Sequence, residues 1–270
     1  MASTPQQQQF ANDGYLRFPA FLTPAETADL LVLLRDAQAR QQEHSHLDRG
    51  GMTFKHNVWR HSQPLRDFLA SPKLVHALRD VIGRDFWLRW DQTIEKKPGG
   101  AAFPWHQDNG YNGLLDEHYQ FWIALTPMTR ENGGLWLQPG SHKAGVVRHT
   151  FQGSHAFHAG DDSKAVFVPA APGDALIFSS LMLHKTDANV TKDQSRLAYV
   201  MEFMRSGDID PFIEPPYLVV ARDGEPAPAM VQRQPGALSA RNQLRYLWPR
   251  LQRSARSART SMANLLRGRR

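Results

Sequence analysis

A histidine and an aspartate stand two residues apart in the segment Phe-Pro-Trp-His-Gln-Asp, residues 103–108. On an extended strand, His106 and Asp108 project to the same face, so an imidazole nitrogen and a carboxylate oxygen can bind one metal ion. The third ligand would come from a distant part of the chain, and His184 follows an apolar run at residues 175–178. Two histidines and one carboxylate leave three positions of an octahedral iron(II) ion open for oxygen activation. The spacing therefore predicts an iron(II) site at His106, Asp108 and His184.

A second histidine–aspartate pair of the same spacing, His46 and Asp48, competes with this interpretation. Gln, Glu, His and Arg residues surround it without a strand pattern, so we expect His46 to lie on the solvated surface. His106 instead follows a Pro-Gly-Gly turn at residues 98–100 and an apolar approach, which favours a position inside a barrel. The context thus favours the later pair as metal ligands.

An arginine at the start of an apolar strand is the candidate for binding an anionic cosubstrate. Arg196 precedes the run 197–201 and lies 12 residues after His184, so it can face the same cavity and hold a carboxylate through two parallel hydrogen bonds. Thr186 can donate its hydroxyl to the same group. 2-Oxoglutarate matches this arrangement, because one carboxylate would bind the arginine while the 2-oxo acid end chelates iron. A surface ion pair is the alternative role for Arg196.

An ordered set of short motifs extends these observations over most of the chain. The motifs are Asp-Gly-Tyr-Leu (13–16), Phe-Leu-Thr-Pro (21–24), Trp-His-Gln-Asp (105–108), Phe-Trp-Ile-Ala-Leu (121–125), Glu-Asn-Gly-Gly-Leu (131–135), Pro-Gly-Ser-His (139–142), Pro-Gly-Asp-Ala-Leu (172–176), His184, Asn189 and Arg196. Their order resembles that of the phytanoyl-CoA dioxygenase family of iron(II)/2-oxoglutarate oxygenases, from roughly residue 10 to residue 204.

The resemblance implies a fold and a set of site residues. It implies a double-stranded β-helix in which Arg196 anchors the distal carboxylate of 2-oxoglutarate and Thr186 occupies a small hydroxyl position. It also implies that Trp122 walls the cosubstrate site and that Gln92 points inward near it. Trp122 as an ordinary core residue and Gln92 as any hydrogen-bonded strand residue remain the alternatives. The implied iron ligands are His106, Asp108 and His184.

Substrate contacts are expected from loops beside the metal motif, since loops near a metal commonly meet the substrate. Asn109 and Tyr111 follow the motif directly. Trp59 belongs to residues 52–61, which connect two predicted helices and are candidates for the mouth of the site. The sequence therefore predicts substrate contacts at Trp59, Asn109 and Tyr111.

The elements that must position these residues are mainly β-strands. Thr23, Pro24 and Glu26 form a capping-box pattern that predicts a helix over residues 23–40, and Ser71 with Pro72 begins a second helix that ends near residue 83. Between residues 86 and 203, short apolar runs alternate with Gly, Pro, Asn and Asp clusters, which is typical of a sandwich or barrel. We expect a double-stranded β-helix (jelly roll, cupin-like) core with N-terminal packing helices. The expected strands are 86–94, 120–125, 134–137, 165–168, 175–178 and 197–203.

The chain has 270 residues and no cysteine, which excludes disulfide scaffolds, thiolate zinc sites and cysteine nucleophiles. We expect one catalytic domain over residues 1–232, with a core at about 10–204. Six prolines between residues 211 and 235 favour a meandering cover segment at 205–232 over more sheet. Residues 233–270 carry ten arginines and no acidic residue. The remaining 22 basic and 26 acidic residues leave the body at −4.

The basic tail at 233–270 is expected to be helical, with leucines at helical spacing among the arginines. It fits an acidic carrier protein or an anionic membrane surface, and a solvated end is the alternative. Nucleic acid is a less favoured partner, because the body does not carry a basic face. No apolar run approaches the about 20 residues of a membrane span, so we expect a cytoplasmic protein without a transmembrane segment.

The resemblance implies an enzyme that uses iron(II), 2-oxoglutarate and O2. We expect it to hydroxylate an unactivated C–H bond of a small-molecule or carrier-linked substrate and to release succinate and CO2. Desaturation or ring formation can follow from the same chemistry, and the residues do not separate these outcomes. A nucleic-acid demethylase and a catalytically inactive β-barrel that only binds a ligand are the alternatives. The intact set of metal ligands disfavours the inactive barrel.

Overall fold

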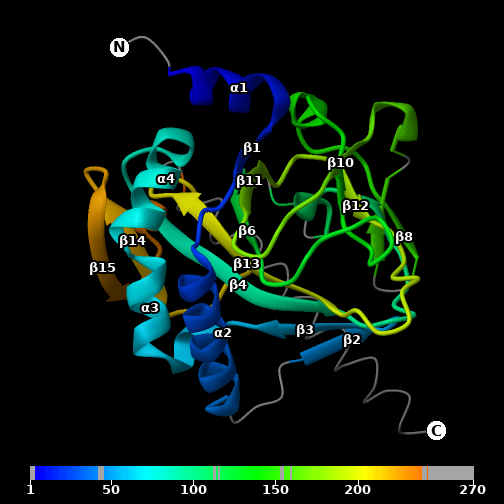
Figure 1. The fold of residues 1–270 in the computed structure, drawn as a ribbon. Coiled ribbons are helices and arrows are strands. Elements are labelled where there is room, and N and C mark those ends of the chain that lie inside the picture. The colour runs from blue at the N-terminus through cyan, green and yellow to red at the C-terminus, as the bar shows by residue number, and fades with distance from the viewer. Residues whose placement is uncertain are drawn as a thin grey trace, which may run out of the picture.

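Two antiparallel β-sheets face one another, and helices cover the outer side of the larger sheet (Figure 1). This computed structural model describes residues 4–41, 46–111, 114, 116–152, 155–158, 160–238 and 242. The arrangement confirms the expected mainly-β jelly roll with N-terminal packing helices.

The larger sheet has nine strands and the smaller sheet has four. The order of the larger sheet is β1 (Tyr15–Phe18), β11 (Ala175–Ser179), β6 (Tyr119–Ala124), β13 (Arg196–Arg205), β4 (Phe86–Lys96), β14 (Tyr217–Arg222) and β15 (Glu225–Val231), with β3 (Met52–His56) and β2 (His46–Arg49) attached through β4. The smaller sheet runs β10 (Val166–Val168), β7 (Leu135–Leu137), β12 (His184–Thr186) and β5 (Phe103–His106), and a separate ribbon pairs β8 (Thr150–Gln152) with β9 (His155–Phe157). Each of the six runs expected from the sequence is a strand.

Strand β6 shows how one segment serves two cores. All six of its residues are buried, because both faces of the larger sheet are covered. Phe121 and Ile123 pack with the helices, whereas Trp122 and Ala124 point between the two sheets. The two-residue period of a strand therefore separates a helix-side core from an interior that faces the smaller sheet.

The helices begin where the capping signals predict. Helix α2 (Pro24–Ala39) has Thr23 as N-cap in a complete capping box, and α4 (Pro72–Ile82) has Ser71 as N-cap and ends at Gly83. Two further helices, α1 (Pro5–Asp13) and α3 (Gln63–Leu69), were not expected. Figure 1 shows α2, α3 and α4 along the side of the larger sheet that faces away from β10 and β12.

The expectation that residues 205–232 cover the barrel without more sheet is wrong. Strands β14 and β15 form a hairpin, and β14 pairs with β4 in the larger sheet. Asp223 and Gly224 make its two-residue turn, both at positive φ (51° and 78°), which is the conformation that favours Asp-Gly in hairpins. The prolines at 226 and 228 are tolerated because β15 is the edge strand, where missing N–H donors break few ladder bonds.

A second unexpected hairpin joins β2 to β3, so the backbone of His46 lies in a strand and not in an irregular segment. Gly50 and Gly51, both at positive φ, form its turn. The predicted basic helix falls mostly on residues 239–241 and 243–270, which lie outside the described residues. None of the helices that the structure describes is long and apolar enough to cross a membrane.

Candidate active site

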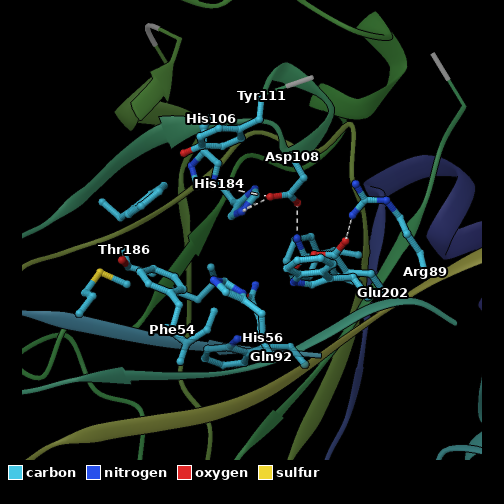
Figure 2. A pocket seen from close by; sticks show the side chains of 18 of the residues that line it. Phe54, His56, Arg89, Gln92, His106, Asp108, Tyr111, His184, Thr186 and Glu202 are labelled. Atoms are coloured by element: carbon cyan, nitrogen blue, oxygen red, sulfur yellow. Dashed lines mark hydrogen bonds and ion pairs between the residues drawn. The ribbon is translucent and has the colours of Figure 1, made fainter. Parts of the chain in front are cut away.

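The three predicted metal ligands meet at one end of the interior. His106 ends β5 and His184 begins β12, and these two residues are direct partners across the two strands. Asp108 lies in the short 3-10 helix η2 (Asp108–Gly110) that follows β5. Each histidine Nε2 atom lies 3.7 Å from Oδ1 of Asp108, and the two imidazole rings are 4.0 Å apart between centroids. Figure 2 shows the three side chains converging on one point.

Backbone carbonyls orient both imidazoles. Nδ1 of His106 lies 2.8 Å from the Pro104 carbonyl, and Nδ1 of His184 lies 3.0 Å from the Met182 carbonyl. A carbonyl oxygen only accepts, so each Nδ1 carries the proton and each Nε2 presents a lone pair to the cluster. This tautomer is the one required for metal binding through Nε2.

The charge state of the cluster suits a divalent cation. Burial lowers the pKa of His184 to about 4 and that of His106 well below its usual range, so both rings are neutral near pH 7. Burial raises the pKa of Asp108 to about 7, only partly offset by Arg89 and by Gln120, which donates to Oδ2. Within the described part of the chain, this is the one group of three histidine or carboxylate side chains close enough to hold a metal ion. Its ligand atoms lie within 4.8 Å of one another.

A cavity of about 380 Å³ lies beside the cluster, between the two sheets. Aromatic and aliphatic side chains form much of its wall, and a few polar groups project into it, as in most small-molecule sites. Besides the three ligands, the residues predicted from the sequence that line it are Gln92, Tyr111, Trp122, Thr186 and Arg196.

Arg196 is a buried cation at one end of this cavity. Only 1% of the residue is exposed. Its Nη1 donates to the Gly133 carbonyl at 3.0 Å, and its guanidinium carbon lies 5.7 Å from the centre of the Trp122 ring. No described carboxylate forms an ion pair with it, and burial lowers its pKa to about 10. A buried arginine without a counter-ion is stabilised by an incoming anion.

Lys96 adds a second basic side chain at the same end, and sequence reasoning missed it. It is the direct partner of Arg196 across β4 and β13. Its ammonium donates to Oγ1 of Thr186 at 2.8 Å and to the Asp187 carbonyl at 2.5 Å. Burial, with a further contribution from Arg196, lowers the pKa of Lys96 to about 7. Because the Thr186 oxygen accepts from Lys96, its hydroxyl proton can point to a ligand.

A different group of charges lies at the other end of the cavity. Arg89 donates through Nε to Asp210 at 2.6 Å and through Nη1 to Glu202. His118 Nε2 lies 3.4 Å from the same Glu202 oxygen. Glu202 and Arg196 are six residues apart on β13, so they share a face and are roughly 20 Å apart along the strand. The cavity therefore runs from a cationic end at Arg196 to a mixed, carboxylate-rich end at Glu202.

The structure does not bring Trp59 to the cavity. Trp59 is 1% exposed and belongs to the core beneath the helices. Its backbone N–H donates to Oδ2 of Asp91 at 3.1 Å, and the Tyr199 hydroxyl donates to the same oxygen at 2.7 Å. The predicted substrate contact at Trp59 has no support here, since its large apolar ring is used for packing. His56, near the start of the same segment, lines the cavity instead.

Asn109 and Tyr111, adjacent in sequence to the metal motif, have different positions. Asn109 is fully buried, and its side-chain amide donates to the Leu114 carbonyl at 2.6 Å and to the Asp116 carbonyl at 3.0 Å. It holds the loop after η2 together and does not line the cavity. Tyr111 does line it, with its ring edge-on to His106 at 5.8 Å between centroids.

The alternation of side chains along each strand was the signal in the sequence that could have identified more of the residues lining the cavity. Gln120 and Glu202 are direct partners across β6 and β13, and Gln120 is two residues before Trp122 on β6. Since alternate residues share a face, placing Trp122 inward also places Gln120 inward. By the same rule, the assignment of Arg196 to the cavity implied Glu202. Arg89 does not follow this alternation, because it and its neighbour Trp90 both line the cavity, and nothing in the sequence around Arg89 indicates this position.

Two antiparallel sheets around a buried site of two histidines and one carboxylate define a jelly-roll protein of the non-haem oxygenase type. A family model assigns the particular group: the model for phytanoyl-CoA dioxygenase (PhyH) matches residues 10–198. The chain belongs to this family, and the predicted family and dioxygenase class are confirmed.

Individual relatives agree with this assignment. A methylphosphonate hydroxylase from Gimesia maris is 27% identical over 203 residues, which cover 72% of this chain and 78% of that protein. The 1-deoxypentalenic acid 11-beta-hydroxylase of Streptomyces arenae is 34% identical over 154 residues, or 50% of this chain and 54% of the hydroxylase. EvdO2 from Micromonospora carbonacea var. aurantiaca, solved with 2-oxoglutarate, has a TM-score of 0.62 at 23% identity, covering 87% of this chain and 95% of that one. The structural likeness supports the fold.

Proposed function

We propose that this protein is an iron(II)- and 2-oxoglutarate-dependent dioxygenase that hydroxylates a C–H bond of a small-molecule or carrier-linked substrate. The proposal rests on one observation: the cluster of possible metal ligands and Arg196 line the same cavity, and Arg196 is buried with no carboxylate partner among the described residues. The reaction balances as R–H, O2 and 2-oxoglutarate giving R–OH, succinate and CO2.

The donor set of the cluster fits iron(II). His106, Asp108 and His184 would hold the ion, and three of six octahedral positions would remain for other ligands. Bound iron(II) supplies the redox chemistry that couples decarboxylation of the 2-oxo acid to oxidation of the substrate. Gln120 keeps Asp108 in place through its hydrogen bond to Oδ2, which leaves Oδ1 directed at the histidines.

Arg196 would bind the distal carboxylate of 2-oxoglutarate. Thr186 would donate its hydroxyl to the same carboxylate, with its oxygen held by Lys96. Trp122 lies against the guanidinium and narrows the cavity, which excludes water from the cosubstrate. Gln92 lines the wall opposite Val200, nearer the Glu202 end of the cavity. Together these residues orient the 2-oxo acid end toward the metal cluster.

Two relatives are named for small-molecule substrates, methylphosphonate in one case and 1-deoxypentalenic acid in the other, which supports a small molecule here. The arginine-rich tail at 233–270 remains a predicted contact for an acidic carrier protein or an anionic membrane surface. Such a contact would bring a carrier-linked substrate to the cavity, although the tail itself would not enter the cavity.

Substrate-dependent release of succinate tests the proposal. The iron(II)-loaded protein is supplied with 2-oxoglutarate, O2 and a panel of small molecules, carrier-linked acids and nucleic acids, and succinate and oxidised product are measured together. Equal amounts of succinate and hydroxylated small molecule are expected. Coupled turnover on nucleic acid would favour a demethylase, and tight iron binding without any succinate would favour an inactive binding barrel.

A further inference from the structure

Arg89 reaches the cavity because β4 contains a bulge. Glu202 pairs with Trp90 and Phe203 pairs with Leu88, so Arg89 is an extra residue without a partner on β13. A regular strand would place Leu88 on the cavity face with Trp90. The bulge turns Leu88 into the helix-side core and adds Arg89 to the cavity wall beside Trp90. Bulges that redirect one side chain are common beside active sites.

Two carboxyl groups share the single positive charge of Arg89 at this end of the cavity. Its single guanidinium binds two carboxylates, Asp210 and Glu202. Asp210 is fully buried and also accepts from the Phe212 backbone N–H at 2.7 Å, so it is committed to the protein. Glu202 lines the cavity and binds Arg89 through Oε2 alone. Within the described residues, no donor is hydrogen-bonded to its Oε1.

The two arginines of the cavity therefore have opposite electrostatic roles. Arg196 has no carboxylate partner among the described residues, so its end attracts an anion. Arg89 is already paired with two carboxyl groups, so it offers no free positive charge to an anion, whereas the Glu202 carboxylate can accept a cation. The charged group available to a ligand thus changes along the cavity, from a cation at Arg196 to a carboxylate at Glu202.

An aromatic wall leads up to the carboxylate end. Trp90, the cross-strand partner of Glu202, lines that end. The His56 ring lies 5.1 Å from Trp90 and 6.3 Å from Phe54 between centroids, and Phe54 lines the cavity nearer Arg196. Indole and phenyl faces attract cations, most strongly where water is excluded. A carboxylate oxygen beside aromatic faces is a suitable receptor for a positively charged nitrogen.

We propose that the substrate carries a cationic nitrogen, such as a protonated amine, and that Glu202 binds it as a specificity-determining residue. This inference rests on the proposed oxygenase function. Glu202 is the cross-strand partner of Gln120, and Gln120 binds the ligand Asp108. A nitrogen held at Glu202 therefore places the neighbouring carbon atoms of the substrate next to the metal cluster. Arg89 acts as a positioning residue that fixes the carboxylate.

Three probes that share a cyclohexyl ring and differ in the charge of its substituent test the inference: cyclohexylammonium, cyclohexanol and cyclohexanecarboxylate. Their binding to the full chain, loaded with iron(II) and 2-oxoglutarate without oxygen, is measured by calorimetry. Cyclohexylammonium is expected to bind at least about 30-fold more tightly than cyclohexanol, as for a desolvated charge pair, and the carboxylate is expected to bind most weakly. Equal affinities for the three probes, or a preference for the carboxylate, would overturn the inference from measurements on the unchanged protein alone.

Variants then assign the preference to one residue. Glu202→Gln keeps the shape and an acceptor for Arg89 but removes the charge, and it should remove most of the ammonium preference. Glu225→Gln is the matched control, because Glu225 is a surface carboxylate with 63% of its side chain exposed. A Glu202→Gln protein that keeps the full preference would contradict the assignment. The affinity for 2-oxoglutarate is measured in the same samples: if the unchanged protein fails to bind it, the proposed function itself is wrong.

Discussion

Arg196→Lys is the change that most directly tests the cosubstrate site. Lysine keeps the positive charge but loses the planar fork that can form two parallel bonds to a carboxylate. In the structure, Nη1 of Arg196 also donates to the Gly133 carbonyl, so the shorter side chain must give up that bond or its contact with the cosubstrate. The change is therefore expected to cost at least one charge-assisted hydrogen bond inside a buried site.

The magnitude follows from the burial of Arg196. A hydrogen bond to a charged group contributes about 1.5–3 kcal/mol, which corresponds to a roughly 10- to 150-fold weaker affinity for 2-oxoglutarate. Iron affinity should stay within about threefold, since Arg196 does not contact the metal cluster. Calorimetry of 2-oxoglutarate binding to the iron(II) protein without oxygen measures the first quantity, and metal titration measures the second.

Arg205→Lys provides the matched control, because Arg205 ends the same strand with 47% of its side chain exposed. Its 2-oxoglutarate affinity should equal that of the unchanged protein. Thermal unfolding of both variants separates loss of the site from loss of the fold. An Arg196→Lys protein that folds and binds 2-oxoglutarate normally would refute the reasoning and would move the carboxylate site elsewhere, with Lys96 as the next candidate.

Four further predictions concern the metal site, the buried core and the tail. His184→Ala should abolish iron-dependent turnover in a folded protein, whereas His46→Ala should change turnover little; wild-type activity in the first variant would exclude the cluster as the metal site. Gln120→Ala should weaken iron binding by about 10- to 100-fold, as loss of a residue that orients a ligand commonly does; an unchanged metal titration would show that Asp108 needs no such support. Burial raises the pKa of Asp91 from 3.8 to about 7. Between these two pH values the Asp91 carboxyl is protonated in the folded state and ionised in the unfolded state. The free energy of unfolding should therefore fall by on the order of 4 kcal/mol as the pH rises from 3.8 to about 7. Asp91→Asn should remove that part of the slope in urea unfolding measured at pH 5 and pH 7.5, and parallel slopes in the two proteins would contradict it. Removing residues 243–270 should spare iron binding and basal 2-oxoglutarate turnover while lowering salt-sensitive retention on anionic vesicles or an acidic carrier protein; a truncated protein that unfolds or loses basal turnover would make the tail part of the catalytic domain.

Local rules were enough to predict much of this protein from its sequence. The spacing of His106 and Asp108, the capping boxes of the helices and the apolar runs of the strands each depend on residues close together in the chain. These features follow from the geometry of a single helix or strand, so they do not require knowledge of the partner elements. The interior position of Trp122 was expected from the family resemblance, and that of Arg196 from its place at the start of a strand shortly after His184.

Tertiary structure decided the features that depend on which strands pair and in what register. The bulge that turns Arg89 into the cavity exists only because Glu202 pairs with Trp90, and Lys96 joins the cosubstrate end only because β4 lies beside β13. Trp59 was expected at the substrate mouth, yet helix packing buries it in the core. Such positions depend on contacts between residues far apart in sequence. The sequence of one segment does not specify those contacts, because the same side chain is compatible with the same local helix or strand whether it lies in a core, in a cavity or at the surface.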